Sequence, residues 1–351
     1  MKKLSITILL ALLIASAAMA KQPKNVIIMI GDGMGLAQVY TAMVRNGNSL
    51  NLERCTFTGF SKTYSANNYT TDSAAGGTAI SCGVKTDNYM IGTRPDSSSV
   101  ENILEQAERN GKSTGLVVAC SVTHATPAAF VAHQPNRGMD DEIAADFLKS
   151  NIDVFIGGGR KFFEQRSDKR NLTNELKDKG FQIAYTLDEV NAVTDGKLAG
   201  LLYEEQNPDI TQRGDMLPNA VKAAINILDN NKKGFFMMIE GSQIDWACHA
   251  NDVELETLEM LDFDKTIGLV LDYAAKDGNT LVIITADHET GGLTLPKGNM
   301  EEGTFAANFS TKSHTGTPVP IYAFGPGAEN FTGFMENSSI KAKIEKIAKL
   351  K

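Results

Sequence analysis

The run "NVIIMI", residues 25–30, is followed at once by "GDG", residues 31–33, and this stretch indicates the class of fold. It is a short, uninterrupted apolar run that ends at a turn signal. Such runs are typical of strands that are buried on both faces of a parallel sheet. Asp32 stands directly where the strand should end. The stretch therefore predicts a central strand with a carboxylate at its carboxyl end.

Further apolar runs of the same kind alternate with amphipathic patterns. The other predicted strands are 114–120, 153–158, 234–241, 280–287 and 319–325, and the predicted helices are 98–111, 139–151, 215–231 and 251–278. This alternation predicts one α/β domain with a doubly wound, mostly parallel central sheet and helices on both faces. Residues 160–214 are the least regular part of the chain, and we expect insertions or excursions from the sheet there.

The first twenty residues differ in kind from the rest. Lys2 and Lys3 precede an apolar run without charges over residues 4–18, and residues 18–20, "AMA", fit a small-x-small cleavage pattern. We expect residues 1–20 to be a signal peptide and residues 21–351 to be a periplasmic or secreted catalytic domain. No later run approaches the ~18 apolar residues of a spanning helix, so we expect no membrane span in the mature chain.

Charge and cysteine content limit the partners. The formal charge of −8 becomes −10 once Lys2 and Lys3 are removed, because each carries one positive charge. An acidic chain is a poor candidate for binding nucleic acid, and an anionic substrate would need a locally positive site. The four cysteines lie at positions 55, 82, 120 and 248. An oxidising compartment permits disulfides, but free buried thiols are about equally expected in a chain of this length.

Polar residues gather where several predicted strands end. Asp32 follows the first strand, residues 121–126 follow the second, Glu240 lies near the end of the fourth, and residues 287–289, "DHE", close the fifth. Sites in open α/β sheets form beyond the carboxyl ends of the strands. Each placement alone could be chance, but four at one edge of a sheet predict a functional site.

Three of the five histidines stand in settings that suit metal ligands. Asp245 and His249 are four residues apart, on one face of a helical turn, and His288 follows Asp287 directly. His314 lies in "TKSHTGTPVP", a loop-like segment without a core pattern. Mixed imidazole and carboxylate groups suit zinc, whereas sets of oxygen ligands suit magnesium.

Ser73 and Arg137 are candidates for handling a phosphoryl group. Ser73 begins a helix-like stretch, so it is either an N-cap or a nucleophile at the positive end of a helix, where phosphate is favoured. No histidine near it in the sequence looks like its general base, so we expect a metal to lower its pKa. Arg137 is either an ordinary surface residue or a bidentate clamp on phosphate oxygens.

Six motifs together resemble one family. They are "GDGMG", "TDSAAGGTA", "THATPAAFVAHQPNR", "EGSQIDWACH", "TADHETGG" and "HTG", and their order and context are those of alkaline phosphatases. The resemblance runs from about residue 25 to about residue 327. It implies the doubly wound α/β fold and the hydrolysis of phosphate monoesters at alkaline pH. Typical members act through a phosphoserine intermediate, with retention of configuration at phosphorus.

The resemblance also implies roles for individual residues. One zinc would be held by Asp245, His249 and His314, and a second by Asp32, Asp287 and His288, with Ser73 bound to the second zinc as the nucleophile. Asp32 would bridge to a third metal, usually magnesium, which is held with Thr126 and Glu240. The clamp on the phosphate would be Arg137. A homodimer is the usual assembly, although a monomer is also compatible with this short chain.

The chain departs from part of the family at two positions beside the site. His124 and Trp246 stand where some members have aspartate and lysine, so the third metal could be magnesium or zinc. Trp246 would lie beside the phosphate and act with His124 on water and product release. His133 matches no ligand position and is expected to be structural. The alternatives are a phosphodiesterase or sulfatase of the same superfamily, a sugar-phosphate isomerising relative, and a non-catalytic protein that binds phosphate or metal.

Overall fold

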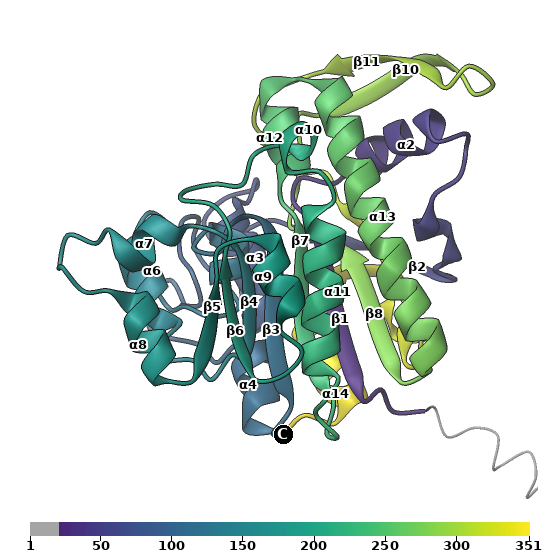
Figure 1. Cartoon of the computed structure of the whole chain (residues 1–351). Coiled ribbons are helices and arrows are strands. Elements are labelled where there is room, and N and C mark those ends of the chain that lie inside the picture. Colours follow the sequence, from purple (N-terminus) through teal and green to yellow (C-terminus); the bar gives the residue numbers. More distant parts are fainter. Residues whose placement is uncertain (1–20) are drawn as a thin grey trace, which may run out of the picture.

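The computed structural model describes residues 21–351, so the predicted signal peptide lies outside the described residues. A ten-stranded sheet crosses the molecule in the order β14-β2-β13-β8-β1-β7-β3-β4-β6-β5 (Figure 1). Its strands are β1 (Asn25–Gly31), β2 (Phe57–Lys62), β3 (Ser113–Ser121), β4 (Val154–Gly158), β5 (Phe181–Ala184), β6 (Lys197–Leu201), β7 (Phe235–Gly241), β8 (Thr280–Thr285), β13 (Val319–Phe324) and β14 (Gly333–Glu336). All six predicted strands are confirmed.

The centre of the sheet is parallel, as the apolar runs predict. β1 lies between β7 and β8 and pairs in parallel with both, and β3, β4, β6 and β5 continue the parallel set. The exception is β13, which runs antiparallel to both β8 and β2. Direction cannot be read from a strand's own apolar pattern, because a buried strand has the same composition in either direction.

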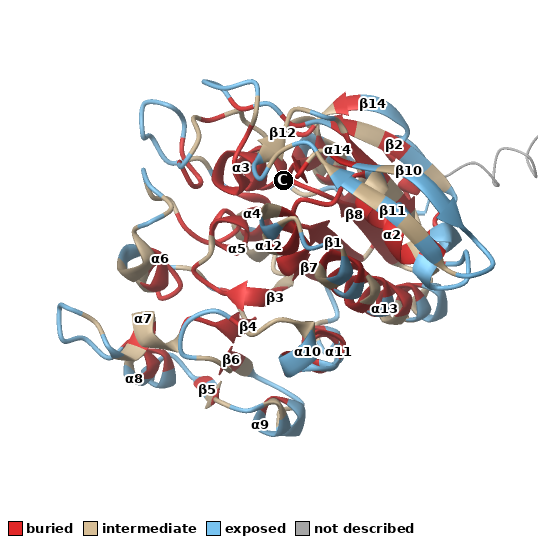
Figure 2. Ribbon diagram, turned by 90° about the horizontal axis from the view of Figure 1, so that it is seen from above, coloured by how far each residue is buried: buried red, intermediate tan, exposed pale blue. Residues whose placement is uncertain are grey.

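Helices cover both faces, which gives the molecule two cores. Side chains of β1 alternate between them: Val26, Ile28 and Ile30 point into one core, and Ile27 and Met29 into the other. The first core contains residues of α3 (Ser73–Cys82), α4 (Ile103–Arg109), α5 (Ala125–Ala128), α6 (Asp140–Asp146), α7 (Arg160–Glu164), α8 (Leu172–Asp178), η2 (Ala328–Phe331) and α14 (Ser339–Ala348). The second contains residues of α2 (Leu36–Arg45), η1 (Asn51–Arg54), α9 (Leu187–Ala192), α11 (Met216–Leu228) and α13 (Val253–Asp277). Figure 2 shows the buried strands between these two layers.

The four predicted helices form, each within its predicted range. The longest, α13, begins at the N-cap Asp252, whose side chain accepts a hydrogen bond from the Leu255 backbone N–H. It ends at Gly278, which has a positive φ of 64°. α4 begins with a capping box, in which Asn102 and Glu105 satisfy each other's backbone N–H groups. Local sequence signals therefore set both ends of α13 and the start of α4, whereas α6 and α11 begin without a side-chain cap.

The expectation of excursions over residues 160–214 is wrong. This region supplies β5 and β6, which extend the sheet at one edge, together with α7, α8, α9 and α10 (Ile210–Arg213). The sequences of the two strands, "FQIA" and "KLAGL", are short and contain small or polar residues. β5 is an edge strand and needs little apolar surface, whereas β6 lies between β4 and β5, and its pattern is weak because it is short and contains Ala199 and Gly200.

Smaller elements lie beside the main sheet. α12 (Gln243–Ala250) follows β7, β9 (Glu289–Thr290) pairs with β12 (His314–Thr315), and β10 (Leu293–Asn299) forms a hairpin with β11 (Thr304–Phe309) that lies above α12 and α2 in Figure 1. Within residues 21–351 there is no helix with the length and apolar content that crossing a membrane requires. The four cysteines in this range are all buried and free of disulfides.

Candidate active site

The predicted site residues converge at the carboxyl ends of four adjacent strands, β8, β1, β7 and β3. Asp32 follows β1, Glu240 lies in β7, Asp287 and His288 follow β8, and Thr126 lies in α5 just beyond β3. All five are buried. Residues that are far apart in the sequence thus meet because the parallel strands share one end.

The first group consists of Asp245 and His249 on α12 and His314 on β12. His249 Nε2 lies 3.3 Å from an Asp245 carboxylate oxygen and 3.1 Å from His314 Nε2. The outer ring nitrogens bind backbone carbonyls: His249 Nδ1 lies 2.6 Å from the Lys312 oxygen, and His314 Nδ1 lies 2.9 Å from the Thr71 oxygen. Such bonds place the proton on Nδ1 and leave both Nε2 atoms free as ligands.

The second group consists of Asp32, Asp287 and His288. His288 Nε2 lies 3.5 Å from Asp32 Oδ1, 3.2 Å from Asp287 Oδ2 and 3.2 Å from the Ser73 hydroxyl oxygen. A histidine therefore does lie within reach of Ser73, contrary to the expectation from the local sequence, because β8 brings it from more than 200 residues away. One imidazole nitrogen cannot satisfy three oxygens, so the four atoms together suit a shared cation better than a hydrogen-bonded pair.

Thr290 joins the two groups. Its hydroxyl donates to Asp245 Oδ1 and lies 3.2 Å from His288 Nδ1. As an acceptor from Nδ1–H it fixes the tautomer in which His288 Nε2 carries a free lone pair. Thr290 lies within the motif "TADHETGG", but no spacing or residue type in the sequence predicts a role for it.

A third group lies beside Asp32. Cys120, His124 and Glu240 offer ligand atoms within 4.8 Å of one another, and the Cys120 thiol lies 3.3 Å from Glu240 Oε2. Thr126 contributes a buried hydroxyl with no hydrogen-bond partner. Cys120 was not predicted here, because nothing in its spacing marks it as part of a site.

Unpaired buried oxygens show that the second and third groups suit cations. Both oxygens of Asp32, Asp287 Oδ2, Glu240 Oε1 and Thr126 Oγ1 lack hydrogen-bond partners. Burial, and then the charge of neighbouring carboxylates, raises the pKa of Asp32 well above its usual range and that of Asp287 to about 6. Burial raises the pKa of Glu240 to about 7. Buried carboxylates without partners are costly, and bound metal ions would compensate them.

Ser73 is the first residue of α3 and not its cap. Asp72 is the N-cap, because its Oδ1 accepts a hydrogen bond from the Ala75 backbone N–H. The Ser73 hydroxyl is thus free of a capping role and lies at the positive end of a ten-residue helix. Gly76 allows the close approach of the β8 loop, since a Cβ there would lie 3.1 Å from the Asp287 Cβ.

Arg137 is oriented from two sides. Its Nη1 donates to Asp72 Oδ2 at 3.1 Å, and its Nη2 lies 3.2 Å from His124 Nε2. Burial, and then the charge of Arg137, lowers the pKa of His124 to about 3, so this imidazole is neutral and accepts from the guanidinium. Trp246 packs edge-on against His124, with ring centroids 5.7 Å apart. Asp72 was missed as a site residue, although an aspartate before a helix start is a common cap.

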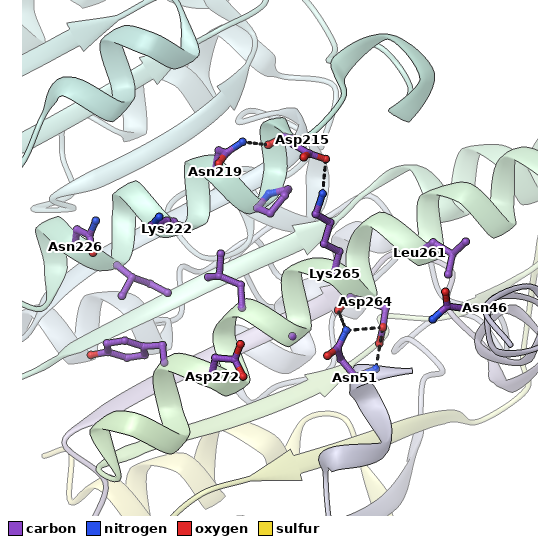
Figure 3. Close-up of a pocket in the computed structure, with 15 residues that line it drawn as sticks. Asn46, Asn51, Asp215, Asn219, Lys222, Asn226, Leu261, Asp264, Lys265 and Asp272 are labelled. Atoms are coloured by element: carbon purple, nitrogen blue, oxygen red, sulfur yellow. Dashed lines mark hydrogen bonds and ion pairs between the residues drawn. The ribbon is translucent and has the colours of Figure 1, made fainter. Parts of the chain in front are cut away.

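These groups open into a cavity of about 480 Å³. Ser73, Arg137, His124, Trp246 and Tyr89 are among the residues that line it, and Arg137 is the one lysine or arginine among the described lining residues. A larger hollow of about 770 Å³ lies between α11 and α13 (Figure 3). Its Lys265 and Asp272 form ion pairs with Asp215 and Arg54, and it contains none of the candidate ligand groups. The chemistry of the lining, not the volume, therefore locates the site.

His133 lies apart from these groups, as predicted. Its ring nitrogens lie 2.7 Å from the Gly92 carbonyl oxygen and 2.8 Å from Glu105 Oε1. These contacts tie the segment that carries Arg137 to α4 and the loop before it.

Comparisons with known proteins agree with this geometry. The family model for alkaline phosphatase matches residues 23–308. Alkaline phosphatase 4 of Bacillus subtilis is 34% identical over 93% of this chain and 89% of its own length, and the Escherichia coli alkaline phosphatase is 29% identical over 91% and 85%. The solved alkaline phosphatase of the Antarctic bacterium TAB5 is 42% identical, with a TM-score of 0.90 over 95% of this chain and 99% of that one. The chain therefore belongs to the alkaline phosphatase family.

Proposed function

We propose that this phosphate monoester hydrolase acts through a phosphoserine intermediate on Ser73, with two zinc ions and a third metal. The reaction class follows from the family, and the roles of individual residues are the proposal. The observation that carries it is the position of the Ser73 hydroxyl at the start of α3, 3.2 Å from His288 Nε2 and beside the buried Asp32 and Asp287. Both carboxylate oxygens of Asp32 and the Oδ2 atom of Asp287 lack hydrogen-bond partners.

The donor chemistry of each group supports a particular ion. Asp245, His249 and His314 would hold one zinc, and Asp32, Asp287 and His288 would hold the other. Thr126 and Glu240, with a second oxygen of Asp32, would hold a third metal through oxygen. When bound, these ions would lower the pKa of the attacking hydroxyl and of water and offset charge on the departing oxygen.

The chain's own residues would bind and orient the phosphoryl group. The free backbone N–H groups at the start of α3 and the Arg137 guanidinium supply positive potential in an otherwise acidic protein. The Ser73 oxygen forms a bond to phosphorus while the bond to the alcohol breaks. Water then attacks the same phosphorus, and Ser73 leaves as the hydroxyl. Two inversions give retention of configuration.

The third metal site could have one of two arrangements, which differ in whether His124 accepts a hydrogen bond from Arg137 or binds the metal. With Nε2 accepting from Arg137, the single proton of the neutral ring lies on Nδ1, and His124 cannot be a ligand. A metal bound through Nδ1 would move the proton to Nε2 and break the Arg137 bond. Because a His124 ligand would cost the Arg137 contact, we propose oxygen donors and magnesium at the third site, with zinc as the competing ion.

We expect His124→Asp to increase magnesium occupancy at the third site, because a carboxylate adds another hard oxygen donor. The solved structure of a TAB5 alkaline phosphatase variant with a histidine replaced by aspartate has Mg bound in its M3 site. Metal analysis after dialysis against equal zinc and magnesium would show magnesium replacing the competing zinc at the third site, up to about one magnesium per chain. Trp246→Phe, beside His124, is the control and should leave the metal content unchanged. A lower magnesium content in His124→Asp would refute this assignment.

The proposed function is tested by assaying the purified protein with zinc and magnesium at alkaline pH. An aryl phosphate monoester should be hydrolysed, while a phosphate diester and a sulfate ester should be poor substrates. Metal analysis of the same sample should give two zinc ions and one further metal per chain. Preferential cleavage of the diester or the sulfate would favour those activities, and phosphate binding without turnover would indicate a binding protein.

We also propose that the protein is exported and forms a homodimer. The pattern of residues 1–20 supports export to the periplasm or medium, and cleavage after Ala20 stays a prediction. The homodimer suggested by the family resemblance likewise stays a prediction.

A further inference from the structure

Tyr89 adopts a backbone conformation that its side chain disfavours. It has a φ of +74°, in the left-handed region where the Cβ of a bulky residue crowds the backbone. Tyr89 is the third residue of a turn closed by the Met90 N–H and the Asp87 carbonyl, 3.2 Å apart. Glycine or asparagine would fit a positive φ more easily than tyrosine does. The geometry of the turn therefore does not explain why a tyrosine occupies this position.

Contacts with proposed catalytic machinery hold this conformation. The Tyr89 N–H donates to Asp72 Oδ2 at 3.1 Å, the oxygen that also receives Arg137 Nη1. The Tyr89 carbonyl accepts from the Arg137 backbone N–H at 2.7 Å. Asp72 is the residue before Ser73, so the backbone of Tyr89 bridges the nucleophile's helix and the phosphate clamp. Strained residues that surrounding bonds fix in this way gather at functional sites.

Core packing does not explain the side chain, because Tyr89 is 60% exposed. It lines the cavity that contains Ser73, Arg137 and Trp246. A phosphoryl group held by Ser73 and Arg137 would occupy the floor of this cavity, and the ester's organic group would extend toward its exposed rim. Tyr89 is a large aromatic surface on that rim, with its backbone fixed relative to both phosphoryl-binding residues.

We propose that Tyr89 forms a subsite for the organic group of the substrate and favours aromatic leaving groups by stacking. This inference rests on the proposed roles of Ser73 and Arg137 and adds a substrate class to them. A planar ring esterified to phosphate would contact the face of Tyr89, whereas a small alkyl group would not reach it. Inorganic phosphate would not contact the ring at all.

Competitive inhibition by three ligands tests the subsite without turnover of the ligand. Phenylphosphonate, methylphosphonate and inorganic phosphate share the phosphoryl-like group and differ in the organic part. In Tyr89→Gly the inhibition constant of phenylphosphonate should rise about 3- to 10-fold, the range for the loss of one aromatic pair. The constants of the other two ligands should stay within about two-fold, and Tyr89→Phe should behave as wild type.

Ser97→Gly is the matched control, because Ser97 also has a positive φ, of 66°, but lies on an exposed turn outside the cavity lining. It should leave all three constants unchanged. If Tyr89→Gly weakens the three ligands equally, Tyr89 serves only to hold Asp72 and Arg137, and the subsite is refuted. Unchanged binding of phenylphosphonate would refute it as well. A wild-type protein that neither hydrolyses monoesters nor binds phosphate would instead refute the proposed function.

Discussion

Ser73→Ala is expected to lower the turnover of phosphate monoesters by a factor on the order of 10³ or more, the scale seen when a nucleophile is removed. The variant loses the only oxygen at the start of α3 that could form the covalent intermediate in the proposed mechanism. Phosphate binding should persist, because Arg137 and the backbone N–H groups of α3 are untouched. Steady-state kinetics together with phosphate inhibition would separate these two effects.

Ser81→Ala is the matched control on the same helix. Ser81 is also buried, and its hydroxyl donates to the Ala129 carbonyl at 2.6 Å, away from the ligand groups. This variant should lose about 1 kcal/mol of stability and keep its turnover. Acid quenching during turnover of labelled substrate should trap phosphate on Ser73 in the wild type. Label on another residue, or unchanged turnover in Ser73→Ala, would remove Ser73 as the nucleophile.

The centre of the fold and the framework of the site could be predicted because each depends on local patterns. The apolar run of β1 and the turn after it place Asp32, and the same logic applies to Glu240 and Asp287. Parallel strands bring their carboxyl ends to one edge, so residues far apart in sequence can be assigned to one place. The four-residue spacing of Asp245 and His249 likewise requires only that α12 be helical.

What could not be predicted depends on contacts between distant segments. The antiparallel direction of β13 leaves no mark in its apolar pattern, and the short strands β5 and β6 have only weak hydrophobic patterns. The link from Asp72 through Arg137 to His124 joins three segments with side-chain bonds that no spacing rule describes. The positive φ of Tyr89 is imposed by its bonds to Asp72 and Arg137, against its own preference.

The contact between His288 and Ser73 allows two mechanisms for activating the hydroxyl. His288 could take the proton directly, as in a serine hydrolase, or both groups could bind one metal. Burial, and then the charge of His314, lowers the pKa of His288 well below its usual range, which makes it a weak base. Asp32 and Asp287 lie at the same nitrogen and would be left without partners. Binding of Ser73 and His288 to one metal therefore accounts for more of the observed contacts than proton transfer to His288 does. Removing the metal distinguishes the two mechanisms.

Chelation is expected to abolish turnover and to leave Asp287 and Glu240 without metal, so that their contribution to the stability of the metal-free protein falls as pH rises. The pKa of Asp287 is raised to about 6 and that of Glu240 to about 7 in the folded chain without metal. The stability that protonated carboxyls give is present below their unfolded pKa of about 4 and is lost as pH rises through the folded values. Each group would contribute on the order of 3 kcal/mol, or roughly 5–10 °C in Tm between pH 4 and pH 8.

Asp287→Asn isolates this effect, because an amide has nearly the same shape and does not ionise. Without metal, Asp287→Asn should show a weaker fall in Tm between pH 4 and pH 8 than the wild-type sequence does. With zinc and magnesium restored at pH 8, the wild type should regain both its turnover and its lost Tm, whereas Asp287→Asn should regain little of either. A metal-free protein that keeps its turnover would support His288 as the base, and a Tm that rises with pH would contradict the electrostatic argument. The carboxylates that make the empty site unstable at alkaline pH are the same groups that would bind metal most tightly there, because deprotonation makes them ligands.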